Sequence, residues 1–370
     1  MKILHLTRKY PPMVGGMERM NHQLVEALRP LADLHLVAWG RPQWGLPAFA
    51  LSAAAQVTAR MARAAARPDV LCLGDAALAP LGIALARPFG VPVAAIAHGL
   101  DVTYPRYGYP ALVLPALRRC DRVICVSRFT SAACAERGVP AERLRVIPNG
   151  IPPPPPVPAR DAARAQLIRL GWPLSPSTPF ILTVGRFVPR KGVAAFIRGG
   201  LPALLQRHPG LVYGVVGRGP DEAAIRRAVA DTRTGDHVFL RGRLDDKTVR
   251  LAYAAADLFL MPNRPVPANP EGFGIVAMEA SGFGLPVVAT AVEGLADAVR
   301  DGVNGRSLPP DRPLEFAAAA ADLLDDPPAL ARLRESARAF AHEHLWEKIA
   351  PRYLDVFQEL LPPPPPEAMP

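Results

Sequence analysis

A run of prolines between two similar series of apolar segments constrains the fold of this chain more than any other feature. In the first 150 residues, short apolar segments alternate with amphipathic ones. That alternation is typical of a parallel sheet with helices on both faces. Residues 151–158 read Ile-Pro-Pro-Pro-Pro-Pro-Val-Pro, which favours stiff polyproline geometry and indicates a spacer. Because the alternation then resumes, the sequence predicts an α/β protein with two doubly wound, Rossmann-like domains in tandem.

The domain limits follow from the positions of these segments. Residues 1–151 are predicted to form the first domain, 152–178 a linker and lead-in, and 179–344 the second domain. A last helix is predicted at 345–361, and the proline-rich residues 362–370 are expected to be a disordered tail. Helices of the first domain are predicted near 18–29, 49–66, 77–87, 110–119 and 128–137. Strands are predicted at 3–7, 34–39, 70–73, 91–97, 122–126 and 144–147, and in the second domain at 180–184, 211–216, 238–240, 258–261 and 286–289.

Composition argues against several classes of protein. No uncharged apolar stretch approaches the roughly 18 residues that a transmembrane helix needs. The apolar part of residues 1–9 is too short for a secretory signal, so we interpret this segment as a buried strand. The cysteines show no paired spacing, and we expect reduced, buried thiols in a cytoplasmic protein: Cys72, Cys120, Cys125 and Cys134.

The positive charge lies almost entirely in the first domain. Residues 1–150 contain 18 Lys and Arg against 9 Asp and Glu, whereas the rest of the chain contains 25 against 24. Such a basic half attracts an anionic partner, although a coding bias towards Arg would produce the same excess. Binding of nucleic acid is not expected, because stacking aromatics are not interleaved with the basic residues. Two arginine clusters are candidates for contact with an anionic membrane: Arg60, Arg63 and Arg67, and Arg118, Arg119 and Arg122.

Three glycine-rich turns follow predicted strands and open helices, which is where ligands bind in open α/β sheets. The first contains Gly15 and Gly16, the second runs from Gly185 to Gly192, and the third begins at Glu271. None has the spacing of a Walker A loop or of a complete dinucleotide fingerprint. Taken alone, each turn is also consistent with an ordinary glycine-containing connection between a strand and a helix. Taken alone, His98 is equally consistent with a hydrogen-bonded histidine in the core. The pair Glu271 and Glu279 is consistent with the solvent-exposed edge of a helix.

Taken together and in order, these segments resemble the retaining glycosyltransferases of family 4. The resemblance covers roughly residues 1–360. The blocks that carry it are PPMVGGMER near the start, HGLD at 98–101, VICVSRFT at 123–130, VIPNG at 146–150, GRFVPRKG at 185–192, VVGRGPD at 215–221, FLRGR at 239–243, EGFGIVAME at 271–279 and GLPVVAT at 284–290. The resemblance implies the GT-B architecture, in which two Rossmann-like domains face each other across a central cleft. It also implies that the last helix crosses back to pack on the first domain.

The resemblance also implies roles for individual residues. Arg186 and Lys191 would bind the donor diphosphate and offset the charge that grows on the leaving group. Glu279 would accept hydrogen bonds from the ribose, and Glu271 would contact the sugar and phosphate. His98 would lie by the sugar carbon, so that the implied catalytic residues are His98, Arg186, Lys191 and Glu271. The other implied donor-binding residues are Gly15, Gly16, Gly272, Phe273, Gly274 and Arg243.

The activity implied is transfer of a hexosyl unit, such as mannose, glucose or N-acetylglucosamine, with retention of configuration. The donor would be a nucleoside-diphosphate sugar, and neither a metal, another cofactor nor a protein nucleophile would be needed. A glycan or lipid-linked acceptor is expected, at the inner face of the membrane, in cell-envelope or polysaccharide synthesis. The loop 292–297 departs from the family pattern, which leaves the donor open. The alternatives that remain are an inactive sugar-nucleotide-binding scaffold and a GT-B epimerase.

Overall fold

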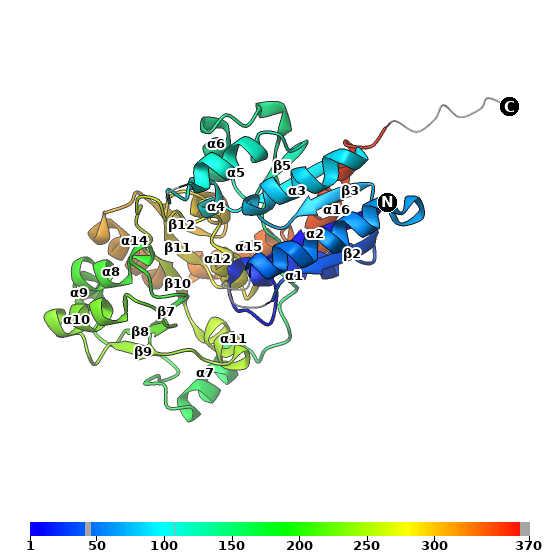
Figure 1. Ribbon diagram of the computed structural model, residues 1–370. Coiled ribbons are helices and arrows are strands. Elements are labelled where there is room, and N and C mark those ends of the chain that lie inside the picture. The colour runs from blue at the N-terminus through cyan, green and yellow to red at the C-terminus, as the bar shows by residue number, and fades with distance from the viewer. Residues whose placement is uncertain (41–45, 107, 363–370) are drawn as a thin grey trace. The chain divides into compact units, whose positions relative to one another are not determined.

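The computed structural model describes residues 1–40, 46–106 and 108–362, and the chain divides into two compact units (Figure 1). The first unit comprises Met1–Gly150 together with Trp346–Pro370, and the second comprises Ile151–Leu345. The chain therefore enters the second unit once and returns to the first for its last helix. The tail at 362–370 was expected to be disordered, and residues 363–370 lie outside the part of the chain that the structure describes.

The first unit is built on a six-stranded parallel sheet in the order β2-β1-β3-β4-β5-β6. Its central strands are continuous apolar runs because helices cover both faces of the sheet. The six strands predicted for this half are confirmed, with ends that differ by two residues or fewer. Their bounds are Lys2–Thr7 (β1), Asp33–Ala38 (β2), Val70–Leu73 (β3), Val93–Ala97 (β4), Arg122–Cys125 (β5) and Leu144–Val146 (β6).

The second unit repeats this architecture with the order β12-β11-β10-β7-β8-β9, again all parallel. Five of its strands were predicted. The sixth, Gly305–Leu308 (β12), was not, because its sequence Gly-Arg-Ser-Leu lacks a buried apolar run. The others are Phe180–Val184 (β7), Val212–Val216 (β8), Val238–Arg241 (β9), Leu258–Met261 (β10) and Val287–Thr290 (β11).

Helices connect successive strands in both units. The first unit contains Gly16–Leu28 (α1), Leu46–Ala62 (α2), Ala79–Ala86 (α3), Leu100–Thr103 (α4), Tyr109–Leu117 (α5), Arg128–Glu136 (α6) and Trp346–Gln358 (α16). The second contains Arg160–Arg169 (α7), Val193–Gly199 (α8), Leu201–Arg207 (α9), Glu222–Thr232 (α10), Asp246–Ala255 (α11), Ile275–Gly282 (α12), Leu295–Ala298 (α13), Pro313–Asp325 (α14) and Pro327–His342 (α15).

Two of these helices bear on the expected domain limits. Helix α16, at the position predicted for the last helix, packs on α1 within the first unit. Helix α7 lies inside the segment 152–178 that the sequence indicated as a linker. It is part of the second unit, because its buried Arg164 donates hydrogen bonds to backbone carbonyls of that unit. No described helix combines the length and the apolar character needed to cross a bilayer. The four cysteines are buried and free.

Candidate active site

The glycine-rich loop after β7 carries the cations predicted to bind a phosphate. After Gly185 the chain forms a 3-10 turn, Pro189–Lys191, and then passes through Gly192 into α8. Gly192 has a φ of 66°, and a Cβ atom there would lie 1.8 Å from the carbonyl oxygen of Pro262. Only glycine fits this combination of left-handed backbone and close approach. The tight turn places Arg190 and Lys191 at the carboxyl edge of the sheet.

The carboxylate of Glu271, in the loop after β10, collects three donors on one oxygen. Lys191 Nζ lies 2.5 Å from Glu271 Oε2, Asn263 Nδ2 donates to it at 2.9 Å, and Arg190 Nη1 pairs with it as well. Glu271 and Asn263 are buried, and the Oδ1 atom of Asn263 accepts no hydrogen bond from the described residues. A buried acceptor without a donor is costly for a protein to keep. Its presence beside the cations indicates a place where a ligand hydroxyl or water would donate.

This cluster has more positive than negative charge. Burial alone would raise the pKa of Glu271, but Lys191 and Arg190 outweigh burial and hold it at about 2. The pKa of Lys191 is itself lowered, because burial and repulsion from the nearby arginines outweigh its attraction to Glu271. Lys191 is therefore incompletely compensated by its carboxylate partner. An additional anion would stabilise its charge.

The loop that departs from the family pattern fixes the backbone of Glu271. The Glu271 N–H donates to the carboxylate of Glu293, and the Glu271 carbonyl accepts from Gly294 N at 3.0 Å. A Cβ atom at Gly294 would lie 1.9 Å from the carbonyl oxygen of Gly272, so the two loops are in close backbone contact. Burial raises the pKa of Glu293, and the charge of Glu271 adds to that effect. Glu293 thus links the loop after β11 to the glycine-rich turn that precedes α12.

The remaining predicted residues of the second unit differ in their burial and in their contacts. Glu279 lies on α12, and its carboxylate is 3.5 Å from the hydroxyl of Tyr253. Gly274, with a φ of 89°, immediately precedes α12, and Phe273 is buried. Arg186 and Arg243 are both exposed. The electrostatic effect of Arg186 on Lys191 places Arg186 near the cluster, whereas no contact connects Arg243 to it among the described residues.

In the first unit, Gly15 and Gly16 form the start of α1, as predicted. A side chain at Gly16 would meet nothing within 4 Å, whereas a Cβ atom at Gly15 would lie 2.1 Å from Oε2 of Glu18, so the carboxylate of Glu18 lies beside the helix start. Free N–H groups at such a helix start attract anions. Lys9 adds a cation, although its Nζ is already paired with the buried Glu18 at 3.2 Å.

His98 is tied to α1 through one carbonyl oxygen. The Gly74 carbonyl accepts hydrogen bonds from His98 Nε2 at 3.0 Å and from Asn21 Nδ2, on α1, at 3.3 Å. Because a carbonyl oxygen can only accept, Nε2 carries the proton and Nδ1 is the acceptor atom of the ring. The backbone N–H of His98 donates to Asp101 Oδ1 at 2.8 Å, which fixes the position of the ring. The structure thus connects His98 to Asn21, which lies on α1 five residues after Gly16.

Comparison with known proteins decides the family. The family model described as Glycosyl transferases group 1 matches residues 168–340, and the one described as Glycosyltransferase Family 4 matches residues 14–153. A GDP-mannose-dependent alpha-(1-6)-phosphatidylinositol monomannoside mannosyltransferase of Mycolicibacterium smegmatis is 30% identical, with 93% of this chain and 94% of that protein covered. The chain belongs to glycosyltransferase family 4. The resemblance seen in the sequence is thereby confirmed.

Solved structures of low sequence identity support the GT-B fold. HepE of Anabaena, in a structure with UDP, is 21% identical with a TM-score of 0.78, and 97% of this chain and 100% of that one are covered. Sucrose-phosphate synthase from Thermosynechococcus elongatus is 23% identical with a TM-score of 0.78, at 97% and 98% coverage. Each of the two six-stranded sheets therefore corresponds to one Rossmann-like domain of this family 4 glycosyltransferase.

Three residues of the cluster were not singled out from the sequence: Arg190, Asn263 and Glu293. Arg190 stands inside the GRFVPRKG block, next to Lys191, so the motif itself contained a signal. Asn263 follows β10 by two residues, a position from which side chains reach the carboxyl edge of a sheet. For Glu293 the sequence showed only that its loop departs from the family pattern.

Proposed function

We propose that this glycosyltransferase moves a hexosyl unit from a nucleoside-diphosphate sugar to an acceptor hydroxyl with retention of configuration. The observation that carries the proposal is the excess positive charge of Arg186, Arg190 and Lys191 over the carboxylates of Glu271 and Glu293. A diphosphate is the anion that a glycine-rich loop with several cations suits best. These cations stabilise the diphosphate as the bond to the sugar breaks and negative charge accumulates on it.

The other predicted residues have positioning roles in this proposal. Glu279 accepts hydrogen bonds from the ribose, and the backbone of Gly272, Phe273 and Gly274 borders the phosphate and sugar together with Glu271. Gly15, Gly16 and His98 are the contribution of the first unit, with His98 Nδ1 as the acceptor for a sugar hydroxyl. Arg243 is proposed to contact the nucleotide from the turn after β9.

Two relatives that this chain covers over almost their whole length favour GDP-mannose as the first donor to test. A relative from Mycobacterium tuberculosis, 30% identical over 96% of this chain, carries the same GDP-mannose-dependent description as the protein from Mycolicibacterium smegmatis. HepE was solved with UDP-glucose as well as with UDP. We therefore propose GDP-mannose as the donor. The experiment must distinguish it from UDP-glucose, which is the second candidate. A lipid-linked glycan acceptor in cell-envelope synthesis is proposed on the same basis.

Catalysis without a divalent metal is part of the proposal. Three side-chain cations stand where a metal would otherwise neutralise the diphosphate. We expect transfer to continue in EDTA at the rate measured in its absence. Loss of activity in EDTA that is restored by Mg²⁺ or Mn²⁺ would overturn this part.

The donor test is a thermal-shift screen of the purified full chain with UDP, GDP, ADP and their common sugar conjugates, without metal. Binding to the native state raises the unfolding midpoint with the logarithm of ligand concentration over Kd. We expect a selective rise with GDP and GDP-mannose that Lys191→Ala and Glu279→Ala abolish. Lys247→Ala is the matched control, because Lys247 is exposed on α11. A midpoint that no nucleotide changes would favour the inactive scaffold instead.

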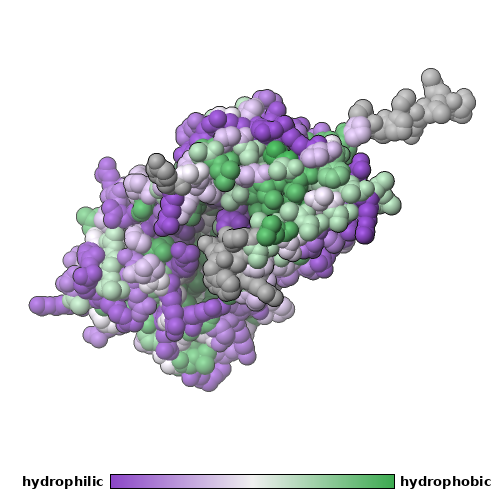
Figure 2. Space-filling view, in the orientation of Figure 1, coloured by the Kyte–Doolittle hydropathy of each residue, from purple (hydrophilic) through white to green (hydrophobic). Residues whose placement is uncertain are grey.

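Peripheral association with an anionic membrane is a second proposal, for the first unit. Figure 2 shows an apolar area on the face of this unit that carries α2 and α3. Leu51 on α2 and Leu112 on α5 are 76% and 64% exposed. Arg63 and Arg119 are exposed as well, whereas Arg122 is engaged by Glu359 at 3.0 Å. Exposed apolar and basic side chains together are typical of interfacial binding, and each basic residue contributes about 1 kcal/mol at an anionic surface.

Flotation with anionic liposomes tests this second proposal. We expect the wild-type protein to float at low salt and to be released at high salt. A Leu51→Ser, Arg63→Ser double variant should float less, while the same changes should leave nucleotide binding intact. Equal flotation of the variant, or flotation with neutral liposomes only, would contradict the proposal.

A further inference from the structure

A cavity lies in the second unit at the edge of the sheet opposite to the Glu271 cluster. It has a volume of about 390 Å³ and is lined in part by Pro179 and Asp257. These residues immediately precede β7 and β10, whereas the proposed donor residues follow the same strands. With a rise of about 3.3 Å per residue, the two sites are separated by roughly the length of a strand, about 15 Å. The cavity is therefore distinct from the donor site.

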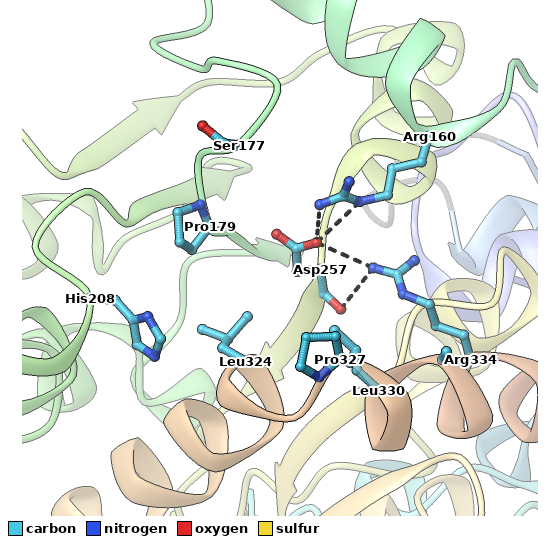
Figure 3. Close-up of a pocket in the computed structure, with 10 residues that line it drawn as sticks. Arg160, Ser177, Pro179, His208, Asp257, Leu324, Pro327, Leu330 and Arg334 are labelled. Atoms are coloured by element: carbon cyan, nitrogen blue, oxygen red, sulfur yellow. Dashed lines mark hydrogen bonds and ion pairs between the residues drawn. The ribbon is translucent and has the colours of Figure 1, made fainter.

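Three arginines converge on the carboxylate of Asp257, and two of them, Arg160 and Arg334, line the cavity (Figure 3). Arg160 Nε donates to Asp257 Oδ1 at 3.1 Å, and Arg164 Nη2 donates to Oδ2 at 2.7 Å. Arg334 Nη2, on α15, lies 3.4 Å from Oδ1 and donates to the Ala256 carbonyl at 2.8 Å. Asp257 also accepts from Phe180 N at 2.9 Å. Three positive charges thus face the buried carboxylate of Asp257, and the exposed carboxylate of Asp161 adds a second negative charge beside Arg160.

Attachment of α7 to the sheet does not require all three arginines. Arg164 is buried, with a side chain 1% exposed, and its Nε and Nη1 atoms donate to backbone carbonyls while its Nη2 atom donates to Asp257. That arrangement satisfies both the guanidinium and the carboxylate. Arg160 and Arg334 add charge at the cavity wall, where their side chains are 37% and 18% exposed. Arg160 Nη1 also lies 3.5 Å from the exposed carboxylate of Asp161, so the positive charge that the fold leaves uncompensated belongs mainly to Arg334.

The donors of Arg334 are only partly used. Its Nη2 atom makes all the hydrogen bonds that it has within the described part of the chain, so Nε and Nη1 stay available. Burial, together with the positive charges of Arg160, Arg338 and Arg164, lowers the pKa of Arg334 to about 10 against the opposing attraction of Asp257. An anion in the cavity would supply acceptors for these atoms and would relieve the repulsion.

His208 provides a further polar group at the other side of the cavity, as Figure 3 shows. Its buried Nε2 atom makes no hydrogen bond to the residues described, although Asp325 Oδ1 lies 3.3 Å away. The wall between the histidine and the arginines is apolar and includes Pro179, Leu324 and Leu330. The cavity therefore combines a cationic end, an apolar wall and an unsatisfied imidazole nitrogen.

We propose that this cavity binds the phosphate group of a small phosphorylated organic compound. Arg160 and Arg334 hold the phosphate oxygens, the apolar wall contacts the organic part, and His208 Nε2 bonds to a polar group at its far end. Arginine is suited to this task, because its planar fork matches the geometry of phosphate oxygens. The cavity volume limits the ligand to metabolite size.

The experiment is isothermal titration of the full chain with inorganic phosphate and with phenyl phosphate, in a chloride buffer of constant ionic strength. The proposed donor site also attracts phosphate, so the titrations use the Lys191→Ala background. We expect saturable binding of one equivalent, tighter for phenyl phosphate because of the apolar wall. Arg334→Gln should weaken it at least tenfold, and Arg332→Gln, at an exposed position on the same helix, should leave it unchanged.

A cavity-filling variant separates binding from folding. Ala331 lines the cavity and is exposed, so Ala331→Phe obstructs the space, keeps every charge and is not expected to destabilise the protein. We expect it to weaken phenyl phosphate binding at least tenfold without lowering the unfolding midpoint. Binding that persists in Ala331→Phe and Arg334→Gln, or that is absent once Lys191 is replaced, would overturn the proposal.

Discussion

At the scale of single residues, the charge state of Glu271 connects stability to the site. Because its folded pKa of about 2 is below the ordinary value of 4.5, the ionised form stabilises the protein above pH 4.5. That contribution is lost as the pH falls from 4.5 towards 2. A shift of this size corresponds to at most on the order of 3 kcal/mol. The lowered pKa of Lys191 reduces the net gain, since part of the attraction only offsets the burial of the amine.

Glu271→Gln should therefore lower the unfolding midpoint most at neutral pH. The difference from the wild type should narrow below pH 4.5 and become small near pH 2, where the wild-type carboxylate is about half protonated. Thermal unfolding followed by circular dichroism from pH 2 to 7 measures this. Glu315→Gln is the control, because Glu315 and its partner Arg312 are both more than half exposed. A midpoint difference that stays constant over the whole pH range would contradict the pKa assignment.

The sequence could predict those site residues that stand in contiguous motifs, but not their partners. Lys191 and Glu271 were predicted because each belongs to a recognisable block. Their mutual contact joins positions 80 residues apart, and nothing in either block states that they pair. Asn263 and Glu293 reach Glu271 only because β10 and β11 end at the same edge of the sheet. Such convergence is a property of the fold, which the order of residues does not contain explicitly.

At the scale of elements, the turn from the 3-10 segment into α8 depends on one glycine. Gly192→Ala would place a Cβ atom 1.8 Å from the Pro262 carbonyl oxygen, and it would strain a left-handed backbone by about 1–2 kcal/mol. The loop must shift, and Arg190 and Lys191 shift with it. We expect nucleotide affinity to fall at least tenfold, as measured by calorimetry. Gly235→Ala is the matched control, because a Cβ atom there meets nothing within 4 Å. Wild-type affinity in Gly192→Ala would show that the loop tolerates the change.

Most strands were predictable because they are buried on both faces. A parallel strand covered by helices is a continuous apolar run, as Leu258–Met261 shows, and its limits were predicted without error. The edge strand β12 is partly exposed and pairs with β11 alone, so it needs no such run. Helix α7 was missed for a related reason. Its mean composition is polar, and it is held by the buried Arg164 as well as by an apolar stripe.

At the scale of the whole molecule, the first unit is discontinuous in sequence. Helix α16 completes it from the far end of the chain and packs on α1. Trp346 Nε1 donates to Gln23 Oε1 at 3.0 Å, and the ring of Trp346 covers Gly150, where a Cβ atom would come within 2.4 Å of it. The stability of the first unit should therefore depend on α16, which follows the entire second unit in the sequence.

Tyr353 on α16 allows this dependence to be measured. The side chain is fully buried, and its hydroxyl has no hydrogen-bond partner within the residues described. Tyr353→Ala removes only packing, at a cost of about 3–5 kcal/mol to the first unit. Hydrogen exchange followed by mass spectrometry should show faster exchange in α1, with α12 of the second unit unchanged. Tyr353→Phe is the control and should not destabilise, because it removes a hydroxyl that is buried without a partner. Equal acceleration in α1 and α12 would mean that the two units unfold together.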